Sequence, residues 1–103
     1  MAVQLRGAHL LIKGELLREV FGAASQVRMV YYPKEHSLLL APVEDAVFSQ
    51  LHKTSTQMLK TRNLDGDGSV SLRELLIDYD LNDADRPLSF EQVKGLGILK
   101  IEI

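Results

Sequence analysis

Cysteine is absent from the 103-residue chain. Its absence excludes disulfide frameworks, thiolate nucleophiles and zinc sites with sulfur ligands. The three histidines, His9, His36 and His52, lack the spacing of a metal-binding pair. Any metal would have to be held by oxygen ligands or histidine, and we expect the chain to use no cofactor.

Long apolar runs are also missing. The longest, such as residues 10–12 and 38–42, fall far below the ~20 residues that a membrane-spanning helix needs. Residues 1–7 lack the apolar core and cleavage site of a secretory signal. We therefore expect a soluble, cytoplasmic protein without a membrane partner.

The composition is that of one ordinary globular domain, with 46% apolar and 25% charged residues. The net charge of −2 is unevenly distributed. Residues 1–34 carry five basic and two acidic side chains, whereas residues 63–91 carry two basic and eight acidic ones. This acidic stretch opposes nucleic-acid binding unless the fold turns it away from the binding face.

The first forty residues predict a strand, a short helix and a hairpin. Residues 9–12 form an apolar run, and residues 15–21 have helical spacing that ends at Gly22. Residues 27–32 are β-branched and aromatic, residues 33–36 are typical of a turn, and residues 37–41 are apolar.

A linking helix is expected next. Pro42, Glu44 and Asp45 suit a helix start, because proline tolerates the first turn and carboxylates favour the positive end of the helix dipole. An apolar stripe consists of Val43, Val47, Leu51 and Met58. The pattern predicts a helix over residues 43–61.

The order of elements then repeats. Residues 70–72 predict a strand, residues 74–79 a helix, and residues 88–90 and 98–103 two further strands. An offset of 61 residues aligns Leu38 with Leu99 and Leu40 with Ile101. A unit of about 40 residues is too small to bury a core alone, so the two units are expected to pair.

The second unit carries a recognisable pattern. It comprises Leu64, Asp65, Gly68, Val70 and Leu72, then the helix at 74–79, then segments 83–90 and 96–101. This pattern resembles the swapped-hairpin unit of AbrB-like and MraZ-like proteins. The expected linking helix lies where MraZ-like proteins place the helix between their two repeats.

The resemblance implies an α+β, strand-rich fold, namely a pseudo-symmetric double-split (swapped-hairpin) β-barrel with short helices. It further implies a single domain, 1–103, with a first unit at 5–42, the linking helix at 43–61 and a second unit at 63–103. The function it implies is that of a DNA-binding transcriptional regulator, with double-stranded DNA as partner. The DNA contacts would come from basic residues near the strand-to-helix junctions: Arg6, His9, Lys13, Arg18 and Arg73.

Two departures favour an alternative function. MraZ-like repeats carry an Asp followed four residues later by an Arg, and the arginine position holds Ser69 in the second unit and His9 in the first. Family members also usually have proline after the strand, where this chain has Lys13 and Arg73. Arginine provides bidentate contacts that serine cannot. The alternative is a non-enzymatic interaction module that kept the fold and lost the DNA contacts, with a protein partner or self-association.

Residues 63–74 also resemble an EF-hand calcium loop. The oxygen-bearing residues of this loop are Asn63, Asp65, Asp67, Ser69, Ser71 and Glu74. Asn63 replaces the usual first aspartate, and no second loop lies at the spacing of an EF-hand pair. A turn before a strand is therefore the favoured interpretation, and calcium binding is the third alternative.

Catalysis is not expected. The chain has no glycine-rich phosphate loop, nucleophile elbow or His–carboxylate spacing, and no small-molecule substrate is indicated.

Overall fold

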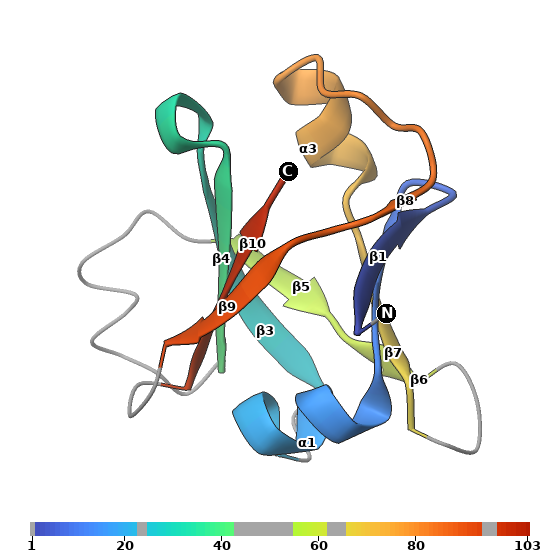
Figure 1. The fold of residues 1–103 in the computed structure, drawn as a ribbon, viewed down its shortest axis with the longest axis vertical. Coiled ribbons are helices and arrows are strands. Elements are labelled where there is room, and N and C mark those ends of the chain that lie inside the picture. Colours follow the sequence, from blue (N-terminus) through green and yellow to red (C-terminus); the bar gives the residue numbers. More distant parts are fainter. Residues whose placement is uncertain (1, 23–24, 43–54, 62–65, 94–96) are drawn as a thin grey trace.

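The computed structural model describes residues 2–22, 25–42, 55–61, 66–93 and 97–103 (Figure 1). Within these residues the chain is α+β and strand-rich, with two five-stranded antiparallel sheets and few short helices. This confirms the predicted α+β, strand-rich class.

Each sheet contains strands from early and late parts of the chain. The first sheet has the order β6 (Lys60–Thr61), β7 (Gly68–Ser71), β2 (His9–Ile12), β1 (Val3–Arg6) and β8 (Arg86–Pro87). The second has the order β5 (Ser55–Met58), β3 (Gln26–Tyr32), β4 (Ser37–Pro42), β10 (Ile98–Glu102) and β9 (Phe90–Val93). The central pairs, β2 with β7 and β4 with β10, join residues far apart in sequence.

Two segments pass from one sheet to the other. The N–H of Leu59, between β5 and β6, donates to the Ser25 carbonyl at 2.9 Å. The N–H of Leu88, after β8, donates to the Val3 carbonyl at 3.0 Å. Residues 55–61 and 86–93 therefore tie the two sheets together by backbone hydrogen bonds.

Alternating apolar residues build one core from both sheets. Its fully buried side chains include Leu5, Leu10, Ile12, Val27, Leu38, Leu40, Val70, Leu72, Leu99 and Ile101. Helix α1 (Gly14–Phe21) adds Leu16, Leu17, Val20 and Phe21 to this core. Gly22, with φ +63°, ends α1 as the sequence predicts.

The remaining short helices are η1 and α3. The 3₁₀ helix η1 (Pro33–Glu35) forms the tip of the β3–β4 hairpin. Helix α3 (Arg73–Asp78) follows β7 and buries Leu76. In Figure 1, α1 and α3 lie at opposite ends of the molecule.

The predicted linking helix is wrong over its last third. Residues 55–58 and 60–61 are strands, because β5 pairs with β3 from Gln26 to Met29 and β6 pairs with β7. Met58, expected on the apolar stripe of a helix, is 61% exposed. Residues 43–54, with the remaining stripe positions, lie outside the described residues.

Tyr31 is a buried polar side chain in the core. Its ring packs edge-on against Tyr79, with ring centroids 5.0 Å apart. Its hydroxyl is buried and has no hydrogen-bond partner among the described residues. Burial, and to a smaller extent Tyr79, raises the pKa of the Tyr31 phenol. The ring therefore contributes packing, while its hydroxyl is desolvated without compensation.

We expect Tyr31→Phe to leave the free energy of unfolding unchanged or to raise it by up to about 1 kcal/mol, because an unpaired buried hydroxyl is removed. The raised pKa means that the unfolded chain ionises first, so wild-type stability should fall as the pH rises above about 10. The variant should lose less stability there. Urea unfolding at neutral and alkaline pH measures both effects, with Tyr32→Phe as the control. A loss above about 1 kcal/mol at neutral pH would contradict the unpaired hydroxyl.

Candidate nucleic-acid interface

The structure divides the five predicted DNA-contacting residues between two ends of the first sheet. Arg6 lies opposite His9, and His9 lies opposite Ser71, two residues before Arg73. Arg6, His9 and Arg73 therefore form one group, the α3 end. Lys13 and Arg18 follow the other end of β2 and form the α1 end.

The β1–β2 turn shapes the α3 end. Gly7 and Ala8 have φ angles of +55° and +63°, the signs of a type I′ hairpin turn. The Gly7 N–H donates to Asp85 Oδ1 at 2.8 Å, and His9 Nδ1 donates to the Gly7 carbonyl at 2.9 Å. Because the turn is held from both sides, the adjacent Arg6 and His9 project from a fixed backbone.

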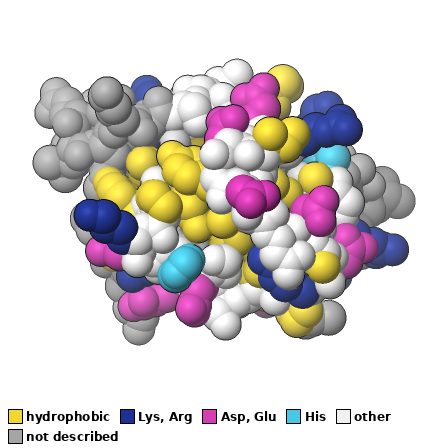
Figure 2. All heavy atoms as spheres, turned by 90° about the horizontal axis from the view of Figure 1, so that it is seen from above, with side chains coloured by type: hydrophobic (Ala, Val, Ile, Leu, Met, Phe, Trp, Pro, Cys, Tyr) yellow, Lys and Arg dark blue, Asp and Glu magenta, His cyan; other side chains and the backbone are white. Residues whose placement is uncertain are grey.

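A depression of about 540 Å³ lies beside this turn. It is lined by residues of the turn, of β2, of β7, of α3 and of the loop after α3: Gly7, Ala8, His9, Ser71, Arg73, Leu76, Ile77 and Asp83. Cationic, apolar and acidic side chains thus share one hollow. Figure 2 shows the end of the molecule that holds α3, where acidic and basic side chains are interspersed around an apolar patch.

The acidic side chains at the depression and the turn, Asp83 and Asp85, come from a loop that folds on itself. The Ala84 N–H donates to Asn82 Oδ1 at 2.9 Å, and Arg86 donates to the carbonyls of Asn82 and Ala84 at 2.8 and 2.9 Å. Arg86 is therefore engaged within the loop. The loop brings Asp83 to the depression and Asp85 to the turn, and both carboxylates lower the positive potential of the α3 end.

The α1 end has a different electrostatic balance. Lys13 Nζ lies 3.4 Å from Asp67 Oδ2, while Asp67 Oδ1 accepts the Gly14 N–H at 2.8 Å. Asp67 thus satisfies a donor of the first turn of α1 and pairs with the cation beside it. Arg18 lies close to Gly66. The Lys13 ammonium thus lies beside a carboxylate, which lowers the positive potential at the α1 end.

The calcium-loop residues serve other purposes where the structure describes them. Ser69 and Ser71 belong to β7, and Ser69 is buried. Glu74 lies exposed in the first turn of α3, and Asp67 binds α1. Asn63 and Asp65 lie outside the described residues. Among the residues described, no three His, Asp or Glu side chains are placed to hold a metal ion.

Sequence reasoning missed the roles of Asp67 and Asp85. The sequence offers Asp67 only as a turn residue or, in the third alternative, a calcium ligand, whereas in the structure it accepts the Gly14 N–H of α1. Asp85 belongs to the acidic stretch 63–91 and holds the β1–β2 turn. Asn82, Asp83 and Asp85 cluster in a segment typical of side-chain-bonded turns, which is the available signal. Their partners are distant in sequence and could not be read from it.

Comparison of the chain with protein-family models, with curated protein sequences and with solved structures gives no significant match. None of the helices in the described segments is long and apolar enough to span a membrane.

We expect Asp67→Ala to lower the free energy of unfolding by about 1–2 kcal/mol, because the Gly14 N–H loses its acceptor. Asp67→Asn keeps an acceptor oxygen and should retain most of the stability. Lys13→Ala should cost less than about 1 kcal/mol, since exposed ion pairs contribute little. Urea unfolding of the three variants measures this order, and equal losses for Asp67→Ala and Lys13→Ala would show that the ion pair is the main contribution.

Proposed function

We propose that the chain is a pseudo-symmetric swapped-hairpin barrel of the AbrB/MraZ type. The register of the two hairpins of the second sheet supports this. In β3–β4, Met29 lies opposite Leu40, and in β9–β10, Phe90 lies opposite Ile101. The 61-residue offset found in the sequence relates both members of these pairs.

The central pair of the second sheet has the reciprocity that a two-fold axis requires. Leu38 lies opposite Ile101, and Leu40 lies opposite Leu99. The same offset exchanges these two pairs with each other. Leu39 and Lys100, which the offset also relates, lie opposite one another at the centre.

The neighbour relations of the strands support closure. Each segment in the following order is hydrogen-bonded to the next: β7, β2, β1, residues 86–93, β10, β4, β3, residues 55–61 and again β7. In this arrangement, the pairing of β1 with β8 corresponds to the pairing of β5 with β3 in the other half of the pseudo-symmetric fold. The second half then begins at residue 55 rather than at residue 63.

For this fold we propose a non-enzymatic DNA-binding function at the α3 end. The observation that carries it is the strand register, which places Arg6 opposite His9, while His9 and Arg73 line one depression. Arginine contacts phosphate through a planar fork of donors, and phosphate contacts dominate affinity for duplex DNA. Because His9 and Ser69 stand at the signature arginine positions, we expect contacts to the phosphate backbone and weak sequence discrimination.

We expect mixed-sequence duplex DNA to bind, with an affinity that falls steeply between about 50 mM and about 200 mM salt. Arg73→Ala should weaken binding to all sequences and reduce the slope of log K against log salt by about 0.9. Lys13→Ala is the matched control and should change neither quantity, because Lys13 lies at the other end and pairs with Asp67. Asp83→Asn should tighten binding by removing a carboxylate from the depression. Fluorescence anisotropy of a labelled duplex measures all three variants.

Two results would overturn the DNA-binding proposal. One is the absence of binding at low salt. The other is an equal loss for Lys13→Ala and Arg73→Ala, which would indicate diffuse attraction rather than a site at the α3 end.

A protein-interaction module is the second function we propose, and exposed apolar side chains favour it. Ile77 is 71% exposed and Tyr79 45% exposed, both at the α3 end, and Phe90 on β9 is 41% exposed. A contiguous apolar patch rimmed by polar side chains is typical of a partner-binding site, and Figure 2 shows such a patch at the α3 end. The anisotropy titration separates the two functions, since an interaction module need not bind DNA at any salt concentration.

A further inference from the structure

Strand β9 has a hydrogen-bonding edge that no other described strand covers. Its pairing with β10 uses one edge, where the Glu102 N–H donates to the Ser89 carbonyl at 2.9 Å. Backbone groups alternate in direction along an antiparallel strand, so the N–H and C=O groups of Phe90 and Gln92 point to the opposite edge. The Leu88 N–H, which points the same way, bonds to Val3, but β1 reaches no further along β9.

The corresponding edge in the first half is covered. Met29 stands in the same register as Phe90, opposite a buried residue of the central strands. Strand β5 pairs with β3 there, with Ser55 opposite Met29, and Met29 is only 7% exposed. Phe90 is 41% exposed. In the first half, the chain itself thus covers the corresponding edge with an extended segment, β5. The inference drawn for β9 rests on the correspondence between the two halves proposed above.

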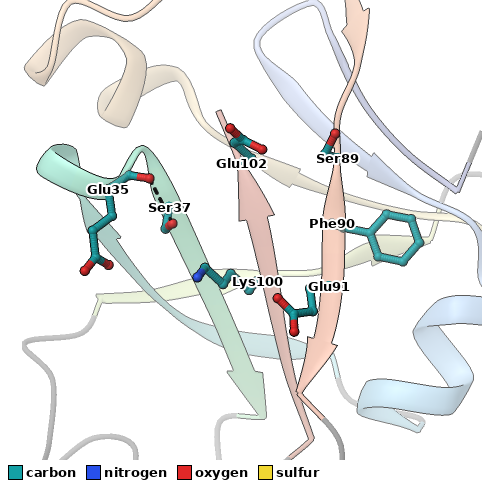
Figure 3. Close-up of a pocket in the computed structure, with 7 residues that line it drawn as sticks. All are labelled: Glu35, Ser37, Ser89, Phe90, Glu91, Lys100 and Glu102. Atoms are coloured by element: carbon teal, nitrogen blue, oxygen red, sulfur yellow. Dashed lines mark hydrogen bonds between the residues drawn. The ribbon is translucent and has the colours of Figure 1, made fainter.

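The surface beside the β9 edge is acidic. A depression of about 370 Å³ lies over β4, β10 and β9 and is lined by carboxylates of Glu35, Glu91 and Glu102 and by one ammonium group, that of Lys100 (Figure 3). Figure 3 shows Phe90 projecting from β9 away from Glu91 and Lys100. An occupant of the edge would therefore meet negative charge on one face and an aromatic ring on the other.

We propose that the edge of β9 binds an extended basic peptide by strand addition. The main-chain groups of Phe90 and Gln92 would supply hydrogen bonds, Phe90 an apolar contact, and the three carboxylates the preference for lysine or arginine. A second copy of this chain fits less well. Two β9 strands of four residues bury too little for a stable dimer, and their pairing brings two acidic surfaces together.

The test uses two capped peptides of alternating threonine and lysine or alternating threonine and glutamate. With the full-length protein labelled with ¹⁵N, the lysine peptide should shift the amide resonances of Phe90 and Gln92 in a saturable way. Its dissociation constant should be at least about tenfold lower than that of the glutamate peptide. Gln92→Pro removes an edge N–H that makes no bond to β10, so it should fold and weaken binding at least about tenfold. Gln92→Val keeps the N–H and should bind as the wild type does.

A second variant tests the charge preference of the edge if Gln92→Pro does not fold. Glu91→Lys combined with Glu102→Lys lies on the exposed face and should reverse the preference to the glutamate peptide. Equal binding of both peptides, shifts confined to the α3 end, or unchanged binding by Gln92→Pro would overturn the proposal. Concentration-dependent shifts of the same amides without peptide would assign the edge to a second copy instead. Loss of DNA binding by Arg73→Ala leaves all of these outcomes unaffected, so the two proposals fail independently.

Discussion

The pairing of β4 with β10 is the contact on which the rest of the structure depends. Leu38, Leu40, Leu99 and Ile101 are all fully buried at this pairing, and they come from two segments far apart in the sequence. A two-stranded hairpin is at best marginally stable in water, so neither β3–β4 nor β9–β10 is expected to persist alone. The β2–β7 pairing imposes the same dependence on the first sheet. Both surface features, the α3 end and the β9 edge, owe their positions to these two long-range pairings.

The sequence predicted the elements whose signals are local. Alternating apolar residues located β3, β4 and β10 to within one or two residues, and the helical spacing that stops at Gly22 located α1. The turn at residues 33–36 was also correct, with η1 in its place. The strand-rich α+β class, which the resemblance implied, consists largely of these elements. Each signal depends on neighbours within one turn or one hairpin, which is why one sequence sufficed.

Elements that depend on distant partners could not be predicted in this way. The polar segment Ser55–Met58 is a strand only because it adds to β3, and its apolar spacing with the preceding residues resembled a helix. Likewise Asp67 looks like a turn residue or a calcium ligand until Gly14 is brought beside it. For the candidate site, the sequence identified cations but not their grouping. Only the register of β1, β2 and β7 separates Arg73 from Lys13.

The charges of the two proposed surfaces constrain how they work together. The α3 end gathers cations, yet Asp85 must stay there because it accepts the Gly7 N–H and so fixes the turn that presents Arg6 and His9. The Asp85 carboxylate, which the Gly7 N–H needs as its acceptor, thus limits the positive potential of the α3 end. We therefore expect the affinity of this end for DNA to be modest. The β9 edge lies beside carboxylates that repel phosphate and attract basic peptide. Because the two ligands prefer opposite charges, they would select different surfaces, and DNA and peptide could be bound without direct competition.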